Sequence, residues 1–268
     1  MSDDVRIVIN NGYGLPNARN AGVKNAKGSI VAFIDDDAIA DQDWLLNILK
    51  NYDTAYVVGV GGLIIPLWES SRPIWFPEEL DWVVGCSYKG LPERKAFVRN
   101  PIGCNMSFRK EIFEKVGYFR SDIGRVGKRL LASEETELCI RIFEKYPNLK
   151  IVYDPSAVVY HKVNKKRATL RYLWNRCFNE GLSKSLIINP KQNSIEVLST
   201  ENQYLKYLLT VAIPLRLKRI YKFKNLCHLV ILLLSSFAVF IGFLMGKFWR
   251  TVSTNKAPVS YTHLTLPT

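Results

Sequence analysis

The amino-terminal part of the chain combines short apolar runs with segments of helical periodicity. Ile30–Ile34 is a continuous apolar run that ends at three adjacent aspartates, Asp35 to Asp37. Such a run between turn residues predicts a strand that is buried on both faces. The neighbouring predicted elements are strand Val5–Ile9, helix Asn17–Ala26, helix Asp41–Tyr52 with Trp44, Leu45, Ile48 and Leu49 on its buried face, and strand Tyr56–Pro66. Their order predicts an α/β fold with an open, parallel-type sheet and flanking helices.

The middle of the chain is less regular. Leu67–Pro92 is rich in aromatic residues and proline, which predicts a long functional loop or lid. The remaining predicted elements are strand Asn105–Phe108, helix Lys110–Val116, a helix that begins at Ser133, strands Lys150–Tyr153 and Ala157–His161, and the basic amphipathic helix Arg167–Leu186.

A long apolar segment lies near the carboxyl terminus. Leu226–Gly246 contains no Asp, Glu, Lys or Arg, and its length suffices to cross a hydrocarbon core that needs about 20 residues. It predicts a transmembrane helix, with a buried core helix as the alternative. The shorter Tyr204–Leu215 contains Pro214 and is interpreted as an amphipathic lead-in in the membrane interface or as a second, short span.

The net charge of +13 is concentrated in one region. Residues 162–225 hold 14 Lys or Arg and 3 Asp or Glu, whereas residues 1–161 are nearly neutral. A basic region binds nucleic acid or an anionic membrane surface, and the adjacent apolar segment favours the membrane. The basic residues before the segment outnumber those after it, which predicts a single-pass protein of the cell membrane whose amino-terminal domain faces the cytoplasm.

Cysteine usage excludes two classes of small domain. The five cysteines are odd in number and scattered, no CxxC pair occurs, and there are only three histidines. Neither a disulfide framework nor a zinc knuckle is expected, and a reducing compartment is indicated.

Two acidic clusters are candidates for chemistry. Asp35, Asp36 and Asp37 follow a predicted strand and repel one another, so they are either a solvated acidic turn or a site for a hard divalent cation. Glu134 and Glu135 begin a predicted helix, where acids are favoured by the helix dipole. In a cleft beside a metal, such a carboxylate can also serve as a general base.

Three stretches resemble, in the right order, the motifs of family 2 glycosyltransferases with the GT-A fold. NARNAGVKNAKGSIVAFIDDD is similar to the family's A-R-N-x-G helix and the following strand that ends in D-x-D. NPIGCNMSFRKEIFEKVGYF resembles the G-x-N-x-x-x-R segment, and SEETELCIRI resembles the later G-E-D-x-E-L-x-x-R motif. The resemblance covers residues 10–161 and implies a mixed GT-A sheet and the inverting transfer of a sugar from a nucleotide diphosphate donor.

The resemblance implies a role for each matching residue. Asp35 and Asp37 stand at the D-x-D acids, expected to hold Mg²⁺ or Mn²⁺ and, with Asp36, to contact the donor. Glu135 stands where the family usually has an aspartate as the base on the acceptor hydroxyl, and Arg19 is expected near the nucleotide. The further expected contacts of acceptor or phosphate groups are Asn105, Arg125 and His161, the last being a structural histidine in the alternative interpretation.

Three stretches also resemble a subgroup of the family. WFPEELDWVVGCSYKGLPE, RNPIGCNMSF and EETELCIR look like archaeal-type glucosyl-dolichyl-phosphate glucuronosyltransferases. This resemblance implies a nucleotide-sugar donor, UDP-glucuronate, and a lipid-linked acceptor at a membrane.

The ends of the chain depart from the family pattern. The family normally begins with two more β–α units, the second of which holds the nucleobase, and no stretch before Val5–Ile9 matches them. We therefore expect a chain that is truncated at its amino terminus, weakly stable, and incomplete at the first strands of its sheet, with an exposed edge. Ser260–Thr268 shows no continuity with the basic tail and is expected to be non-native.

The expected organisation has four parts. They are a GT-A domain at 1–190, a basic membrane-proximal segment at 191–225, a transmembrane helix at 226–246, and a short tail at 247–268 whose residues 260–268 are non-native.

Two other functions remain open from the residues alone. Asp35, Asp37 and Glu135 also suit a metal-dependent nuclease or phosphotransferase, whose basic region would bind nucleic acid. The chain can also be a non-catalytic, membrane-anchored fragment. The basic residues adjoin the apolar segment, which argues against a nucleic-acid partner, and the acidic residues match the order of the glycosyltransferase motifs.

Overall fold

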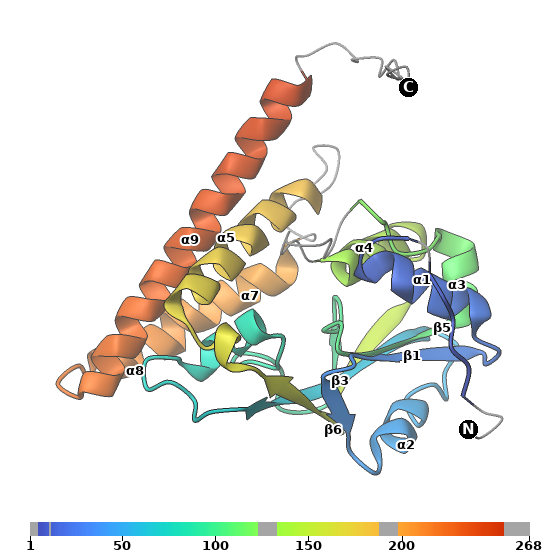
Figure 1. Cartoon of the computed structure of the whole chain (residues 1–268), viewed down its shortest axis with the longest axis horizontal. Coiled ribbons are helices and arrows are strands. Elements are labelled where there is room, and N and C mark those ends of the chain that lie inside the picture. Colours follow the sequence, from blue (N-terminus) through green and yellow to red (C-terminus); the bar gives the residue numbers. More distant parts are fainter. Residues whose placement is uncertain (1–4, 11, 123–132, 188–197, 255–268) are drawn as a thin grey trace, which may run out of the picture.

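The computed structural model describes residues 5–10, 12–122, 133–187 and 198–254. Within them, a mixed sheet has the strand order β1-β5-β3-β6-β2, with β4 paired to β6 (Figure 1). The strands are β1 Ile30–Ile34, β2 Ala38–Ala40, β3 Val57–Trp68, β4 Ala96–Val98, β5 Asn105–Arg109 and β6 Lys150–Val163. Only β3 and β6 are parallel, and the other pairs are antiparallel. The predicted mixed α/β fold is confirmed, whereas the parallel-type sheet expected from element order is wrong.

Strand β6 joins two segments that were predicted as separate strands. The register against β3 shifts between Gly62 and Leu63, where Asp154 is followed by Val158 as the next partner. The extra residues form a bulge, which lets one long strand accommodate Pro155.

Helices cover both faces of the sheet. Helices α1 (Leu15–Asn25), α3 (Lys110–Val116) and α4 (Glu134–Lys145) pack over β1 and β5 (Figure 1). Their core includes Val23, Met106, Phe108, Phe113, Leu138 and Ile142, all fully buried. The short helix α2 (Trp44–Leu49) packs elsewhere on the sheet through Ile48 against Val57 and Val152.

Three amino-terminal predictions are wrong in detail. Residues 5–10 form no strand, and Ile7 and Ile9 are 79% and 87% exposed. Strand β1 therefore lies at the edge of the sheet and pairs only with β5, so it is not buried on both faces, and Ile34 is 40% exposed. Helix α2 is shorter than predicted and leaves Leu45 and Leu49 exposed, because only Trp44 and Ile48 of its predicted apolar face pack against the core.

The predicted lid is partly core. Its 3₁₀ helix η1 (Glu78–Val84) buries Leu80 and Val83 completely, and Phe76 just before it is 1% exposed. These residues join a cluster with Val159 of β6 and Leu173 of helix α5. The segment therefore packs between the sheet and the carboxyl-terminal helices.

The carboxyl-terminal region is helical. Its elements are α5 (Leu170–Ile187), α7 (Ser199–Tyr207), the π-helical turn η3 (Leu208–Ala212), α8 (Ile213–Leu217) and α9 (Phe223–Thr254). In the part of the chain that the structure describes, Phe223–Trp249 is the one helical stretch long and apolar enough to cross a membrane. Helix α9 runs beside α5 (Figure 1). The predicted domain boundary after residue 190 lies outside the described residues, and the domain division stays a prediction.

Candidate active site

The acidic turn joins strands from the two ends of the strand order. Ile34, the last residue of β1, is opposite Asn105 of β5, and Ala38, the first residue of β2, is opposite His161 of β6. The turn closes with a hydrogen bond from the Ala38 N–H to the Asp35 carbonyl, 3.1 Å long. Asp35 therefore lies beside the loop before β5, whereas Asp37 lies beside β6.

Asp37 meets a histidine and an arginine. One of its carboxylate oxygens lies 3.1 Å from His161 Nε2, and the other accepts a 3.1 Å hydrogen bond from Arg167 Nη2. His161 is buried and is held on its other side by Cys86 Sγ, 3.7 Å from Nδ1. A second nitrogen of Arg167 lies 3.3 Å from His161 Nε2. The predicted site residue His161 is therefore in direct contact with the predicted metal ligand Asp37.

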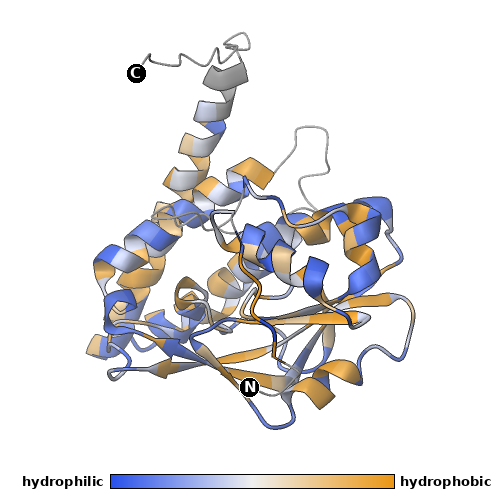
Figure 2. Ribbon diagram, turned by 45° about the vertical axis from the view of Figure 1, so that its right-hand side comes forward, coloured by the Kyte–Doolittle hydropathy of each residue, from blue (hydrophilic) through white to orange (hydrophobic). Residues whose placement is uncertain are grey.

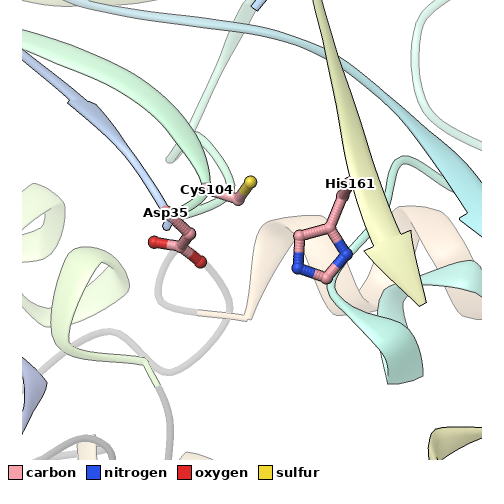
Figure 3. Close-up of side chains that lie close together, drawn as sticks. All are labelled: Asp35, Cys104 and His161. Carbon is pink, nitrogen blue, oxygen red and sulfur yellow. The ribbon is translucent and has the colours of Figure 1, made fainter. Parts of the chain in front are cut away.

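Asp35 and Cys104 face the same histidine. The carboxylate of Asp35, the thiol of Cys104 and the imidazole of His161 place one potential ligand atom each within 4.8 Å of one another. Figure 3 shows these side chains around a common space, with Asp35 and Cys104 on one side and His161 of β6 on the other. The side chains of Asp35 and Asp37 are 32% and 34% exposed, so a ligand can reach them.

The donor set fits a divalent cation. Carboxylate oxygens suit Mg²⁺ and Mn²⁺, and an imidazole adds a ligand that first-row metals accept. His161 lies close to both aspartates, because its ring is within 4.8 Å of the Asp35 carboxylate and its Nε2 is 3.1 Å from Asp37. The predicted ligand Asp37 itself lies outside the group formed by Asp35, Cys104 and His161. The thiol of Cys104 adds a softer ligand to the same group.

Arg19 connects the two acidic clusters. It lies on α1 and is buried, with Nη1 2.6 Å from Glu134 Oε1 at the start of α4. Its Nη2 donates to the Gly103 carbonyl over 3.1 Å and lies 3.6 Å from Asp35 Oδ1. One guanidinium thus reaches the acidic turn, the loop before β5 and the α4 amino terminus, which the sequence separates widely.

Glu134 and Glu135 differ in their surroundings. Glu134 is neutralised by Arg19, whereas Glu135 has no ion-pair partner among the residues that the structure describes. Burial, reinforced by the neighbouring charge of Glu134, raises the pKa of Glu135 to about 7, although Arg19 and Lys184 oppose the shift. A carboxylate with a pKa near neutrality has the property that general bases need.

The α4 amino terminus begins at the predicted Ser133 but has no side-chain cap. Ser133 occupies the N-cap position with φ of 84°, in the left-handed region, and its side chain makes no capping hydrogen bond. The first turn instead carries Glu134, Glu135 and Glu137, which the helix dipole favours. Glu137 pairs with Arg141 one turn further along the helix, 2.8 Å apart.

The remaining predicted site residues lie elsewhere. Asn105 is fully buried, accepts from Trp44 Nε1 and donates to the carbonyls of Leu63 and Ala157, so its amide is occupied within the core. Asp36 is exposed at the tip of the turn. Arg125 lies outside the described residues.

Sequence reasoning missed two residues of the site. Arg167 lies in the short η2 turn (Lys165–Arg167) after β6. It was interpreted only as the first residue of a basic amphipathic helix in the region assigned to a membrane surface. Cys104 was one of five scattered cysteines, and only the pairing of β1 with β5 brings it beside Asp35. The three adjacent aspartates indicated that positive groups lie beside the acidic turn. Arg19 and Arg167 are two such groups.

Comparison with known proteins places this geometry in a family. The family model described as Glycosyl transferase family 2 matches residues 1–117. The chain is 33% identical over 251 residues to the glucosyl-dolichyl phosphate glucuronosyltransferase of Haloferax volcanii, covering 91% of this chain and 78% of the relative. The chain belongs to glycosyl transferase family 2. The predicted family and enzyme class are confirmed, and the alternative of a metal-dependent nuclease is not favoured.

Two further similarities of this glycosyltransferase are more distant. It is 26% identical over 180 residues to the succinoglycan biosynthesis protein ExoM of Rhizobium meliloti, covering 66% of this chain and 54% of that protein. The mannosyltransferase PcManGT from Pyrobaculum calidifontis, solved with GDP-Man and Mn²⁺, has a TM-score of 0.48 and 16% identity. The overlap covers 88% of this chain and 67% of the mannosyltransferase chain.

Proposed function

We propose that this glycosyltransferase transfers glucuronate from a nucleotide diphosphate donor to a lipid-phosphate-linked glucose at a membrane surface, with inversion at the anomeric carbon. Family membership supports the reaction class. The name of the Haloferax volcanii relative, a glucosyl-dolichyl phosphate glucuronosyltransferase, supports the donor sugar and the acceptor. The apolar helix α9 and the basic residues before it support attachment to the cell membrane, with the catalytic sheet on the cytoplasmic side.

The observation that carries the proposal is the Arg19 bridge. Arg19 lies 2.6 Å from Glu134 and 3.6 Å from Asp35, so the α4 start and the acidic turn line the same site. A single displacement at a sugar carbon needs charge stabilisation on the leaving group and a base on the attacking hydroxyl. The acidic turn with its histidine and the half-buried Glu135 meet those two needs in one site.

The donor side of the site is built from anionic and cationic groups. Asp35, Asp37 and His161 would hold Mg²⁺ or Mn²⁺, which when bound neutralises the charge that grows on the leaving diphosphate. Arg19 and Arg167 point guanidinium nitrogens at the same two aspartates and suit phosphate oxygens. The two arginines would orient the donor diphosphate directly, and the two aspartates would do so through the cation that they hold.

The acceptor side rests on Glu135. In its charged form the carboxylate takes the proton of the acceptor hydroxyl while that oxygen forms its bond to the anomeric carbon. The bond from this carbon to the diphosphate oxygen breaks on the opposite face, and the electron pair leaves with the diphosphate. The raised pKa of Glu135 makes it a stronger proton acceptor than a solvated carboxylate.

The test is a transfer assay with the full chain in detergent or proteoliposomes. Labelled UDP-glucuronate and glucosyl-phosphodolichol are incubated with Mn²⁺ or Mg²⁺, and the product is analysed for a glucuronosyl-glucosyl lipid of inverted configuration. Metal-dependent product that is lost on chelation is the expected result. Glu135→Gln should remove transfer, while Glu114→Gln, an exposed glutamate of α3, should not change it. Absence of transfer from any nucleotide sugar would contradict the proposed activity.

A further inference from the structure

Helix α9 packs along the enzyme over half of its length. Gly181 of α5 lies against the backbone of Val239, and Gly242 of α9 lies against the backbone of Phe178, so that a Cβ at either glycine would collide with a carbonyl oxygen. Gly246, one turn further on, lies against the side chain of Ser185, and a Cβ there would collide with its hydroxyl. The two helices run side by side in the same direction (Figure 1). Such close backbone contact makes α5 and α9 one packed unit rather than a domain and a separate tether.

The partner helix α5 is charged beside the middle of α9. Arg176 and Lys184 flank Gly181 and both pair with Glu180, at 2.7 and 3.2 Å. Lys184 also lies 2.8 Å from Glu201 of α7. The first two pairs lie within α5, and the third connects α5 to α7. If α9 crossed a bilayer in this packed arrangement, the charges of α5 would lie at hydrocarbon depth, where ionised side chains are strongly disfavoured.

The outer face of α9 is a continuous apolar stripe. Exposed large side chains follow one another at alternating spacings of four and three residues, at Leu226, Val230, Leu233, Phe237, Phe240 and Leu244. All six are between 42% and 56% exposed. Figure 2 shows the hydrophobic colouring along this helix. A stripe with this spacing along one helix is the pattern of an interfacial helix whose other side is already packed.

The basic residues beside this stripe indicate which kind of surface it binds. Residues 202–268 contain no Asp or Glu. Lys218, Arg219, Lys222 and Lys224, just before and at the start of α9, are exposed. A second copy of the chain, in either orientation, would bring like charges together at the ends of the stripe, where Lys222, Lys224 and Lys247 lie. Anionic lipid headgroups attract the same charges.

We propose that α9 lies in the plane of an anionic membrane surface, with its apolar stripe in the bilayer interface, α5 on its protein side, and both of its ends on one side of the membrane. The inference refines the membrane attachment included in the proposed function. It places the candidate active site close to the headgroups, where a lipid-phosphate-linked acceptor is found. The attachment is monotopic, so the packed α5–α9 pair stays intact.

The decisive test is the sidedness of the two ends of α9. Lys222→Cys and Lys247→Cys are made in the full chain, with the wild type as the background for its own cysteines, four of which are buried. Sealed vesicles with the catalytic face outward are treated with a membrane-impermeant maleimide, and detergent-solubilised samples give full labelling. In-plane binding predicts labelling of both variants in sealed vesicles. Labelling of Lys247→Cys only after solubilisation would show a spanning helix and overturn the proposal.

Vesicle binding tests the chemistry of the surface. A triple variant Lys218→Gln/Lys222→Gln/Lys224→Gln should bind vesicles of phosphatidylglycerol and phosphatidylcholine about 100-fold more weakly, since each basic residue contributes a factor of about 5 near an anionic surface. Leu233→Gln/Phe237→Gln/Phe240→Gln should lose binding altogether while nucleotide binding persists. If this stripe variant instead dissociates a dimer and still binds vesicles, a second copy is the occupant and the proposal is wrong.

These results are independent of the transfer assay. A chain that binds vesicles with both ends outside but transfers no sugar would retain the in-plane attachment and refute the proposed activity. A chain that transfers sugar with a spanning α9 would retain the proposed activity and refute the in-plane attachment.

Discussion

The guanidinium of Arg19 lies 2.6 Å from the carboxylate of Glu134, although 115 residues separate them in the chain. Both side chains are nearly completely buried, at 6% and 5% exposure. The bond fixes the amino terminus of α4, and with it Glu135, relative to the acidic turn. The relative placement of base and donor site therefore depends on one buried ion pair.

Breaking this pair should destabilise the protein strongly. We expect Arg19→Met to lower the free energy of unfolding by about 3–5 kcal/mol, because Glu134 is left buried without a partner. The measurement is denaturant or thermal unfolding of the full chain in detergent. The exposed pair Arg120–Asp122 is the control, and Arg120→Met should cost about 1 kcal/mol or less.

The double variant Arg19→Met/Glu134→Gln distinguishes charge from packing. It should cost less than the sum of the single variants, because neither charge is then left alone. The double variant should be inactive in transfer, because the proposed contact between Arg19 and the donor diphosphate is missing. Additive losses of stability would contradict a direct interaction between the two residues.

Glu135→Gln should separate binding from chemistry. We expect transfer to fall by about 10²–10⁴-fold, the usual contribution of a general base, with donor affinity nearly unchanged. Transfer kinetics and nucleotide titration measure the two effects, with Glu114→Gln as the matched control. Loss of donor binding with the base variant would assign Glu135 to the donor site instead.

The pH dependence of transfer follows from the same residue. Because burial raises the pKa of Glu135 to about 7, the base is protonated and inactive in acid and becomes active as the pH rises through that value. Since its pKa is higher in the folded state than in the unfolded state, the ionised group also lowers stability as the pH rises. Glu135→Gln should therefore melt at a higher temperature than the wild type at pH 8 and show no such pH dependence. An unchanged melting temperature would contradict the burial of this charge.

Much of the sheet and both acidic clusters were predictable from local pattern. Apolar runs gave β1, β3 and β5, and the cap-like acidic start gave α4, because these signals lie within a few residues. The pairing of β1 with β5 was not predictable, since it joins residues far apart in the chain. For the same reason Cys104 and Arg167 were missed, while Asp35, Asp37, Arg19 and Glu135 were named from the motifs that contain them.

Asp37→Ala should abolish metal-dependent donor binding and leave the fold intact. The side chain is 34% exposed, so its removal opens no core cavity, but it removes a predicted metal ligand and the partner of His161 and Arg167. Mn²⁺-dependent UDP binding by calorimetry is the measurement, and Asp53→Ala, an exposed aspartate, is the control. Unchanged Mn²⁺-dependent turnover of the variant would refute the metal assignment.

The thiol of Cys104 should alter which metals bind. A sulfur ligand within 4.8 Å of Asp35 and His161 favours soft cations such as Cd²⁺ over Mg²⁺. Addition of Cd²⁺ should give a thiolate-to-metal absorption band that Cys104→Ser removes, while Cys177→Ser, a buried cysteine of α5, retains it. A band that survives Cys104→Ser would exclude this thiol from the metal site.

Composition predicted the apolar carboxyl-terminal helix but not its packing. Its length and lack of charge predicted a helix, and α9 is that helix. Composition did not reveal that Gly181 and Gly242 allow α5 and α9 to touch, because the contact depends on two residues without side chains in separate helices.

Gly181→Ala should loosen the α5–α9 pair despite the better helix propensity of alanine. A Cβ there would collide with the Val239 carbonyl, so the helices must separate, and overpacking of this kind costs about 1–3 kcal/mol. Gly22→Ala in α1 is the control, since a Cβ there meets no atom within 4 Å and should stabilise the protein by about 0.4–1 kcal/mol. Thermal melting in detergent compares the two. If both variants raise the melting temperature, the backbones of α5 and α9 are not in contact, and the charges of α5 no longer argue against a spanning α9.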